Sequence, residues 1–268
     1  MVKNIDYHII DKCNMNCASC GHFSSLAPAD DNGKSIEQIT SDLTLLSKIK
    51  DEFRTLSILG GEPTLHPQLS KILRIAREIF PNNELLLVTN GVKYDKFNLW
   101  KDAIIENNIH VNLSLYPYVI DYRERAEIIK RTLGPDVVLT ILDFPVDGGF
   151  YYQMFTNRDN AATESELLNC WNRFQCCQVK NGKLYICNLA AQFNVLKDYF
   201  GDKITFDYDG KEYLDLNGDI TADDFYNFMY NAHPKLCDHC IHAHNIQNGM
   251  INKPWDFTKR DIKEWMVD

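Results

Sequence analysis

Short apolar runs alternate with amphipathic stretches through the first half of the chain. Between the apolar runs, hydrophobic residues recur at spacings of three and four, as in Leu69, Ile72, Leu73 and Ala76, which predicts helices. Such alternation is typical of βα units around a parallel sheet. We count five repeats with a possible sixth strand, so we expect an open partial barrel or a doubly wound sheet. The predicted strands are Tyr7–Ile10, Arg54–Leu59, Glu84–Val88, His110–Leu115 and Val137–Leu142.

Unusual residues follow the first four predicted strands. Cys13–Cys20 follows the first strand, Gly60–Pro63 the second and Thr89–Gly91 the third, while Ser114 and Tyr116 close the fourth. In both architectures ligands bind at the carboxyl ends of the strands. We therefore expect these residues to share one edge of the sheet.

The pattern changes after about residue 145. Glycines and the aromatic stretch Phe150–Tyr152 lead into a short helix and a cysteine-rich region. Asn181-Gly182 is a strong hairpin signal before a strand over Lys183–Cys187. Pro254–Met266 reads as a helix that packs back through its aromatic residues. We expect a large domain over residues 1–150 and a smaller module over 151–268.

Composition and charge limit the classes of binding partner and the cellular compartment that we expect. A net charge of −9 and a pI near 5.4 argue against binding to nucleic acid, which needs clustered Lys and Arg. The chain has neither a run of eighteen apolar residues nor a signal peptide, so we expect a cytoplasmic protein without membrane contact. Only twelve residues precede Cys13, which leaves no room for a domain that recognises leader peptides and favours a small-molecule substrate.

The nine cysteines fall into two groups. Cysteines in a cytosolic chain are more often metal ligands or catalytic thiols than disulfide partners. Three lie at 13, 17 and 20, and six follow residue 169, so two sites are implied. Iron–sulfur clusters normally have four cysteine ligands. Three ligands leave one iron open to the amino and carboxylate groups of a bound molecule.

These motifs resemble the radical S-adenosylmethionine (SAM) superfamily. Gly60-Gly61-Glu62-Pro63 matches its G-G-E-P segment, Thr89-Asn90-Gly91 matches its T-N-G, and Ser114 stands at its usual polar position on strand four. The resemblance implies a [4Fe–4S] cluster on Cys13, Cys17 and Cys20. It also implies that SAM is bound by Gly60, Gly61, Glu62, Pro63, Thr89, Asn90 and Ser114. The family usually has an aromatic residue where this chain has Ser19, and His22 or Phe23 could replace it beside the adenine.

The resemblance also implies an α/β fold and a reaction. The fold is a partial (β/α)6 TIM-like barrel, with a C-terminal twitch-like module made of a hairpin and a helix. The reduced cluster cleaves SAM to a 5′-deoxyadenosyl radical, which abstracts hydrogen from an unactivated C–H bond. The electron would come from a donor such as flavodoxin or ferredoxin. A structural zinc site on the three cysteines and His22 is the alternative.

The later cysteines resemble the abbreviated, twitch form of a SPASM module. The resemblance implies a second, auxiliary [4Fe–4S] cluster on Cys170, Cys187, Cys237 and Cys240. Cys176 could replace one of these four, and Cys177 is better explained as a buried thiol. A zinc ribbon is the alternative, because paired cysteines are also what structural zinc prefers.

The overall layout is similar to radical enzymes that oxidise or rearrange aminocyclitols and sugars. Cys20–Pro28 looks like members associated with polysaccharide assembly. We therefore expect dehydrogenation or epimerisation of a sugar or sugar nucleotide. The alternatives are a peptide- or protein-modifying maturase and a non-catalytic zinc or iron–sulfur module. Tyr116 and Asp143 are the candidate catalytic residues, because both lie near predicted strand ends at the same mouth, as do Tyr151 and Tyr152.

Overall fold

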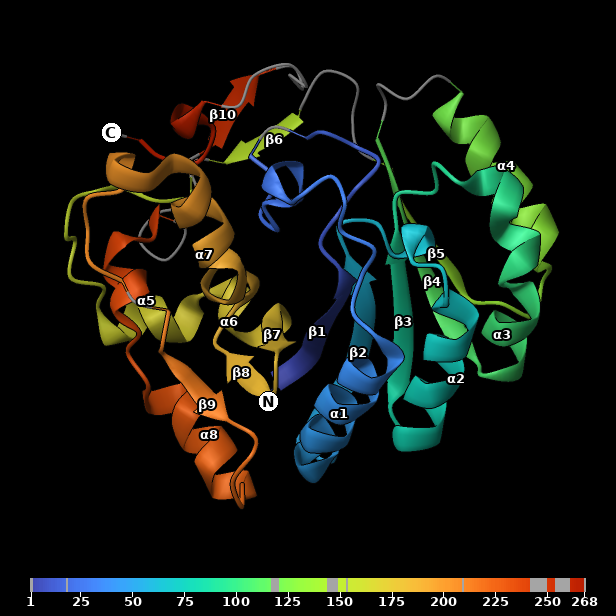
Figure 1. Ribbon diagram of the computed structural model, residues 1–268, viewed down its shortest axis with the longest axis horizontal. Helices are drawn as coiled ribbons and strands as arrows, with labels where there is room; N and C mark the ends of the chain where they lie inside the picture. The colour runs from blue at the N-terminus through green and yellow to red at the C-terminus, as the bar shows by residue number, and fades with distance from the viewer. Residues whose placement is uncertain are drawn as a thin grey trace.

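An eight-stranded, mostly parallel sheet forms the centre of the computed structural model (Figure 1). The structure describes residues 2–267 except 18, 117–120, 144–148, 153, 209, 242–249 and 254–260, and it describes the backbone but not the side chains of 149–152 and 250–253. The strand order is β5-β4-β3-β2-β1-β7-β8-β9. The strands are β1 Val2–Ile10, β2 Phe53–Gly60, β3 Glu84–Thr89, β4 Ile109–Leu115, β5 Leu139–Asp143, β7 Cys177–Lys180, β8 Lys183–Tyr185 and β9 Tyr213–Asp215.

Strands β1 to β5 run parallel, and β7 adds a sixth parallel strand on the other side of β1. The five predicted strands and the α/β partial-barrel class are confirmed. β1 begins at Val2, five residues before the predicted start at Tyr7. The prediction missed this half of the strand because its polar residues interrupt the apolar pattern. Asp6 is only 4% exposed and accepts a hydrogen bond from Asn4 at 2.7 Å. A central strand can bury such a residue when its polar atoms have partners.

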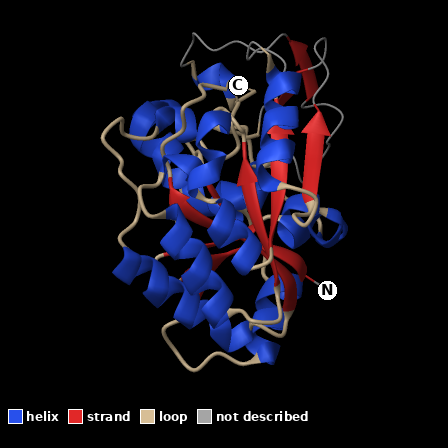
Figure 2. Cartoon of the chain, turned by 90° about the vertical axis from the view of Figure 1, so that its right-hand side faces the viewer, coloured by secondary structure: helices blue, strands red, loops and turns tan. Residues whose placement is uncertain are grey.

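Helices α1 to α4 lie along the outer side of the curved sheet (Figures 1 and 2). In α2 the residues that the helical spacing selects, Leu69, Ile72, Leu73 and Ala76, are all at most 1% exposed. The α-helices are α1 Ile36–Leu46, α2 Leu69–Ile79, α3 Lys101–Glu106, α4 Tyr122–Leu133, α5 Glu164–Asn169, α6 Trp171–Gln175, α7 Asn188–Phe200 and α8 Ala222–Asn231. Short 3-10 helices cover Ser24–Leu26, Ser47–Ile49, Pro63–Leu65, Tyr94–Leu99, Gly201–Lys203, Lys235–His239 and Ile262–Glu264.

The predicted hairpin is present and joins the second half of the chain to the sheet. Asn181 and Gly182 have φ of +54° and +70°, the left-handed pair that a tight hairpin turn requires. The turn is fixed from outside, because the amide of Gly182 donates to the buried carboxylate of Asp42 on α1 at 2.8 Å. β7 then pairs with β1, so one sheet runs through both halves of the chain.

The end of the chain differs from the predicted helix. Within 261–267 the backbone makes a single 3-10 turn, Trp265 still has helical φ and ψ, and pairing with Phe155 begins at Met266. Residues 254–260 lie outside the described residues. The carbonyl of Trp265 accepts from the amides of Met154 and Phe155, and Met266 bridges to Phe155. Trp265 and Met266 are both at most 1% exposed, so burial and pairing with Phe155 end the helical backbone after one turn. A two-stranded pair, β6 Gly149–Tyr152 with β10 Met250–Lys253, lies beside it (Figure 1).

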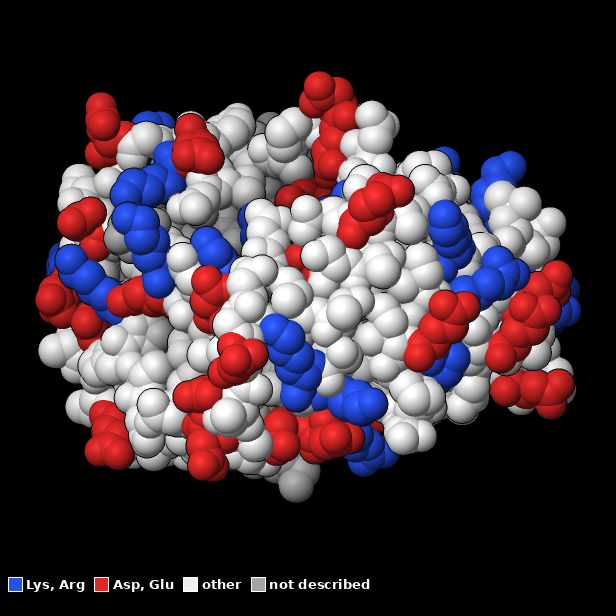
Figure 3. All heavy atoms as spheres, turned by 60° about the horizontal axis from the view of Figure 1, so that its bottom comes forward, with Lys and Arg blue, Asp and Glu red and all other residues white. Residues whose placement is uncertain are grey.

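Acidic and basic side chains are interspersed over the face that holds the amino ends of the strands (Figure 3). Among the described residues, no helix combines the length and the apolar character needed to cross a bilayer.

Trp265→Ala should destabilise the protein by about 3–5 kcal/mol, as is typical when a large buried aromatic residue is truncated. Trp265 is 0% exposed, packs against Phe23 and Phe200, and donates its indole N–H to the carbonyl of Cys20. Urea unfolding followed by circular dichroism would measure the change. The control is Val267→Ala, whose side chain is 52% exposed and should change stability by less than about 0.5 kcal/mol. Equal effects of the two substitutions would contradict the role given to Trp265.

Candidate active site with two groups of cysteines

A cavity of about 130 Å³ opens at the carboxyl ends of β1 to β4. The three N-terminal cysteines line it, together with most of the residues that the motifs select. Pro63 and Asp143 are not among the lining residues. The lining includes Cys13, Cys17, Cys20, His22, Ser24, Gly60, Gly61, Glu62, Thr89, Asn90, Ser114 and Tyr116. The sequence motifs therefore meet in one pocket.

Gly60 and Gly61 allow the end of β2 to touch the cysteine loop. A Cβ atom on Gly60 would lie 2.0 Å from the carbonyl oxygen of Ile10, and one on Gly61 would lie 2.2 Å from that of Lys12. Real Cβ atoms do not approach oxygen so closely. Two hydrogen bonds form at this contact. The amide of Gly61 donates to the carbonyl of Ile10 at 2.8 Å, and the amide of Glu62 donates to the carbonyl of Lys12 at 3.0 Å. These bonds hold the chain that leads into Cys13.

The carboxylate of Glu62 connects two of the motifs. It is 1% exposed and accepts from the amide and hydroxyl of Thr64, the hydroxyl of Thr89 at 2.6 Å and the amide of Asn90 at 2.8 Å. Burial raises the pKa of Glu62, and the hydrogen bonds from Asn90, Thr64 and Thr89 oppose that rise. In this structure Glu62 fixes the T-N-G turn. Asn90 in turn donates to Asn14 at 2.8 Å and to the sulfur of Cys13 at 3.6 Å.

The donor set of this pocket fits a cluster with three cysteine ligands. Burial raises the pKa of the Cys13 thiol, while the amide of Met15 donates to its sulfur at 3.3 Å. A bound metal deprotonates such a thiol. The hydroxyl of Ser24 is buried in the same wall and has no hydrogen-bond partner within the described part of the chain. A small molecule with polar groups, held beside the cluster, would supply one.

Neither Ser19 nor Phe23 lines the pocket. Ser19 is 6% exposed, has φ of +51° and donates its hydroxyl to the carbonyl of Glu264. Phe23 is 0% exposed and packs against Phe155 and Trp265. Of the two residues expected to replace the missing aromatic, only His22 lines the pocket. The C-terminal segment covers the position of Ser19, a long-range contact that no local pattern reveals.

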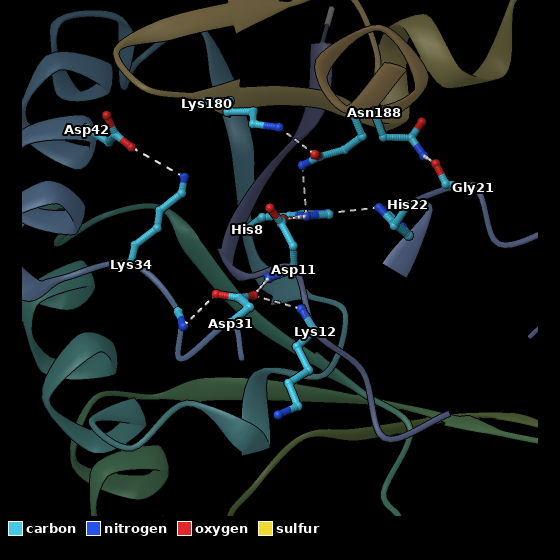
Figure 4. Close-up of polar contacts among 12 residues, drawn as sticks. His8, Asp11, Lys12, Gly21, His22, Asp31, Lys34, Asp42, Lys180 and Asn188 are labelled. Atoms are coloured by element: carbon cyan, nitrogen blue, oxygen red, sulfur yellow. Dashed lines mark hydrogen bonds and ion pairs between the residues drawn. The ribbon is translucent and has the colours of Figure 1, made fainter. Parts of the chain in front are cut away.

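His22 ends a chain of buried polar side chains (Figure 4). Lys180 on β7 donates to the Oε1 of Gln192 at 2.7 Å, and the Nε2 of Gln192 lies 3.0 Å from the Nδ1 of His8. The Nε2 of His8 lies 2.8 Å from the Nδ1 of His22. His8 and Gln192 are each 1% exposed. Burial lowers the pKa of His8 and lowers that of His22 to about 3, so both rings are neutral.

The order of donors along this chain bears on which nitrogen of His22 carries its proton. An ammonium group only donates, so Lys180 sets the amide of Gln192 with its nitrogen toward His8. In that orientation the Nδ1 of His8 accepts from Gln192, and its Nε2–H donates to the Nδ1 of His22. The Asp11 carboxylate lies 3.2 Å from the same Nδ1 and favours a proton there instead. From the shorter contact with Gln192, at 3.0 Å, we infer that His22 keeps its proton on Nε2. His8, a polar residue inside a predicted strand, was the sequence signal for this chain.

The two candidate catalytic residues are in different places. Tyr116 lines the pocket, and burial together with the charge of Cys17, Cys20 and Cys13 raises its pKa, so it is a neutral hydroxyl. Asp143 ends β5, with a 45% exposed side chain that lies 3.6 Å from the Nε of Arg123. The structure thus brings Tyr116 to the cysteines and leaves Asp143 outside. The side chains of Tyr151 and Tyr152 are outside the described residues.

A second cavity is lined by all four cysteines expected at an auxiliary cluster. Cys170, Cys187, Cys237 and Cys240 share its wall with Arg173, Asn172 and three apolar residues. Cys176 does not line it. Cys177 is 0% exposed and donates to the carbonyl of Asn4 at 3.2 Å, so its interpretation as a buried thiol is confirmed. Among the described residues, no three His, Cys, Asp or Glu side chains form a group suited to one metal ion.

One hydrogen bond links the two cysteine sites. Asn188, which follows Cys187, donates its side-chain amide to the carbonyl of Gly21 at 3.2 Å, and Gly21 follows Cys20 (Figure 4). Asn188 is 7% exposed and begins α7. A residue next to a cysteine of the second cavity is therefore hydrogen-bonded to the cysteine loop of the first.

The family is decided by a match over more than half of the chain. The Radical SAM superfamily model matches residues 7–158, which include the first three cysteines, the G-G-E-P and T-N-G segments and Ser114. The chain belongs to the radical SAM superfamily. The comparison of structures agrees: BtrN in complex with AdoMet and 2-DOIA matches 94% of this chain and 98% of its own, with a TM-score of 0.54 and 14% sequence identity. That likeness establishes a shared fold.

Several radical SAM relatives have names that state an activity. The GTP 3′,8-cyclase of Chlorobaculum tepidum is 29% identical over 48% of this chain and 38% of its own length. The S-adenosylmethionine-dependent nucleotide dehydratase of Flammeovirga pacifica is 27% identical over 42% of this chain and 37% of its own length. The chain thus spans less than two fifths of these relatives.

Gly61→Ala should reduce iron binding at the N-terminal cysteines of this radical SAM protein. The added Cβ would push against the backbone of Lys12, at a cost of about 1–3 kcal/mol for overpacking. Iron per chain after anaerobic reconstitution, and SAM binding by equilibrium dialysis, would measure the loss. Gly218→Ala is the matched control, because nothing lies within 4 Å of a Cβ there. If the two variants retain equal iron and SAM, the close approach is unnecessary.

Gln192→Glu should move the proton of His22 from Nε2 to Nδ1. A carboxylate accepts on both oxygens, so it would draw a proton onto the Nδ1 of His8 and leave the Nε2 of His8 as an acceptor. Neutron diffraction from deuterated crystals of both proteins would locate the proton. An unchanged position of the His22 proton would show that Gln192 does not set the tautomer.

Proposed function

We propose that this radical SAM protein abstracts hydrogen from a sugar or sugar nucleotide and dehydrogenates or epimerises it. The pocket that gathers the three cysteines, the glycine pair, Glu62, Ser114 and Tyr116 carries the proposal. When bound there, the cluster and SAM supply a 5′-deoxyadenosyl radical. Cys13, Cys17 and Cys20 would hold the cluster, and Gly60 to Glu62, Thr89, Asn90 and Ser114 would form the wall against SAM.

The chain's own residues would bind and orient the substrate. Tyr116 and His22 line the same pocket. A neutral hydroxyl and a ring N–H would suit the oxygen atoms of a sugar. Neither group needs to ionise for this role. Asp143 keeps a place in the proposal only if a bound substrate extends beyond the pocket to the end of β5.

The four-cysteine cavity supports dehydrogenation over epimerisation. Removing hydrogen from a carbinol carbon leaves a carbon radical, and a ketone forms when one electron and the hydroxyl proton depart. The electron would leave toward Cys170, Cys187, Cys237 and Cys240, and the proton to solvent. A second [4Fe–4S] cluster at these residues would accept that electron. Epimerisation would instead return a hydrogen atom to the carbon and leave no net electron.

The names of the relatives support a substrate of this size. The cyclase is named for GTP and the dehydratase for nucleotides, and both are small phosphorylated molecules that contain a sugar. We further propose a cytoplasmic protein reduced by a flavodoxin or ferredoxin, since the first cluster needs an electron for every SAM cleaved.

Anaerobic reconstitution with iron and sulfide counting and a dithionite-driven assay for 5′-deoxyadenosine tests the proposal. About eight irons per chain are expected, four per cluster, with 5′-deoxyadenosine formed. A panel of sugar nucleotides deuterated on the sugar would then identify the substrate by transfer of deuterium into 5′-deoxyadenosine. About four irons would remove the second cluster, and zinc with no 5′-deoxyadenosine would refute the radical reaction.

Matched cysteine variants assign the ligands. Cys187→Ala should lower the iron content by about half, because it removes a ligand of one of two equal clusters. Cys176→Ala, a cysteine of the same region outside the cavity, should keep all the iron. Iron loss in Cys176→Ala would mean that Cys176 replaces one of the four proposed ligands.

A further inference from the structure

Arg173 on α6 is a buried cation, and one of its N–H donors, the Nη1, makes no hydrogen bond within the described residues; we call it the idle donor. Its side chain is 2% exposed. The Nε donates to the carbonyl of Met229 at 2.5 Å, and the Nη2 donates to the carbonyl of Ala232 at 2.8 Å. The Nη1 is buried and has no hydrogen-bond partner within the part of the chain that the structure describes. A buried guanidinium nitrogen without an acceptor is costly, so its position needs an explanation.

The idle donor belongs to the wall of the four-cysteine cavity. Arg173 lines that cavity with Cys170, Cys187, Cys237 and Cys240. In the described residues, no carboxylate pairs with Arg173. Burial lowers the pKa of Arg173, and the charge of Cys237, Cys170 and Cys187 opposes that change. Burial raises the pKa of the Cys187 and Cys237 thiols, so these two would become negatively charged only when a metal binds them.

A guanidinium does not lose its proton in proteins, so the cavity has a permanent positive charge in its wall. An empty apolar cavity would not stabilise that charge. A cluster with four thiolate ligands is negatively charged, and its sulfur atoms accept hydrogen bonds. The idle Nη1 and the charge of Arg173 therefore both match the group that the cysteines would hold.

We propose that Arg173 donates a hydrogen bond to a sulfur atom of the auxiliary cluster and raises its reduction potential. This inference rests on the second cluster of the proposed function. Reduction adds one negative charge to the cluster, and a cation with an N–H donor stabilises the reduced form more than the oxidised form. Hydrogen bonds to sulfur and net charge are known determinants of cluster potential. Arg173 would thus make the cluster a better acceptor for the electron of a substrate radical.

Potentiometric titration followed by electron paramagnetic resonance (EPR) tests the proposal. In full-length protein with Cys13, Cys17 and Cys20 changed to Ala, the auxiliary cluster is the one that remains to be titrated. Arg173→Gln should shift its midpoint potential to more negative values, because the charge is lost. Arg173→Lys keeps the charge and should shift it less. Equal potentials in the three proteins with equal iron content would overturn the proposal.

A second measurement leaves Arg173 in place. In protein labelled with ¹⁵N-arginine, the reduced cluster should show a ¹⁵N coupling and an exchangeable-proton coupling in pulsed EPR. The absence of both couplings would overturn the proposal even if Arg173→Gln fails to fold. If the triple-alanine protein with Arg173 intact binds no iron, the second cluster itself is refuted, and the inference fails with it for a different reason.

Discussion

The site depends on how closely the end of β2 approaches the loop that follows β1. Gly60 and Gly61 have no Cβ atoms to hold the backbones apart, and two amides reach the carbonyls of Ile10 and Lys12. This places Glu62 in the pocket wall, where its carboxylate accepts hydrogen bonds from the hydroxyl of Thr89 and the amide of Asn90. The cysteine loop and two motifs are therefore one hydrogen-bonded unit, and a change in any part moves the others.

The second half of the chain makes direct contacts with this unit. β7 pairs with β1, Lys180 and Gln192 orient His8 and His22, and Asn188 binds the loop at Gly21. Elements of the second half of the chain thus support the first pocket as well as the four-cysteine cavity. The pairing of β7 with β1 and the hydrogen bond from Asn188 to Gly21 connect the two cysteine groups structurally.

Much of this could be predicted from the sequence because the signals were local. The five parallel strands, the hairpin turn at Asn181-Gly182 and the meeting of the motifs at one sheet edge follow from periodicity and turn chemistry. The grouping of Cys170 with Cys187, Cys237 and Cys240 came from family resemblance and agrees with the cavity that they line. What could not be predicted depends on long-range burial: the contact of Ser19 with Glu264, the pairing of Trp265 with Phe155, and the Nη1 of Arg173, which has no partner among the described residues. Asp143 was chosen by its place at a strand end, and only the curvature of the sheet shows that it faces elsewhere.

The contact between the cysteine loop and the C-terminal segment has a consequence for biosynthesis. Cys20 accepts from the indole of Trp265, and Ser19 donates to Glu264, across 245 residues of sequence. A ribosome that has made the loop must translate 245 further residues before these contacts can form. Until then, neither the hydroxyl of Ser19 nor the carbonyl of Cys20 has the partner that it contacts in the folded protein.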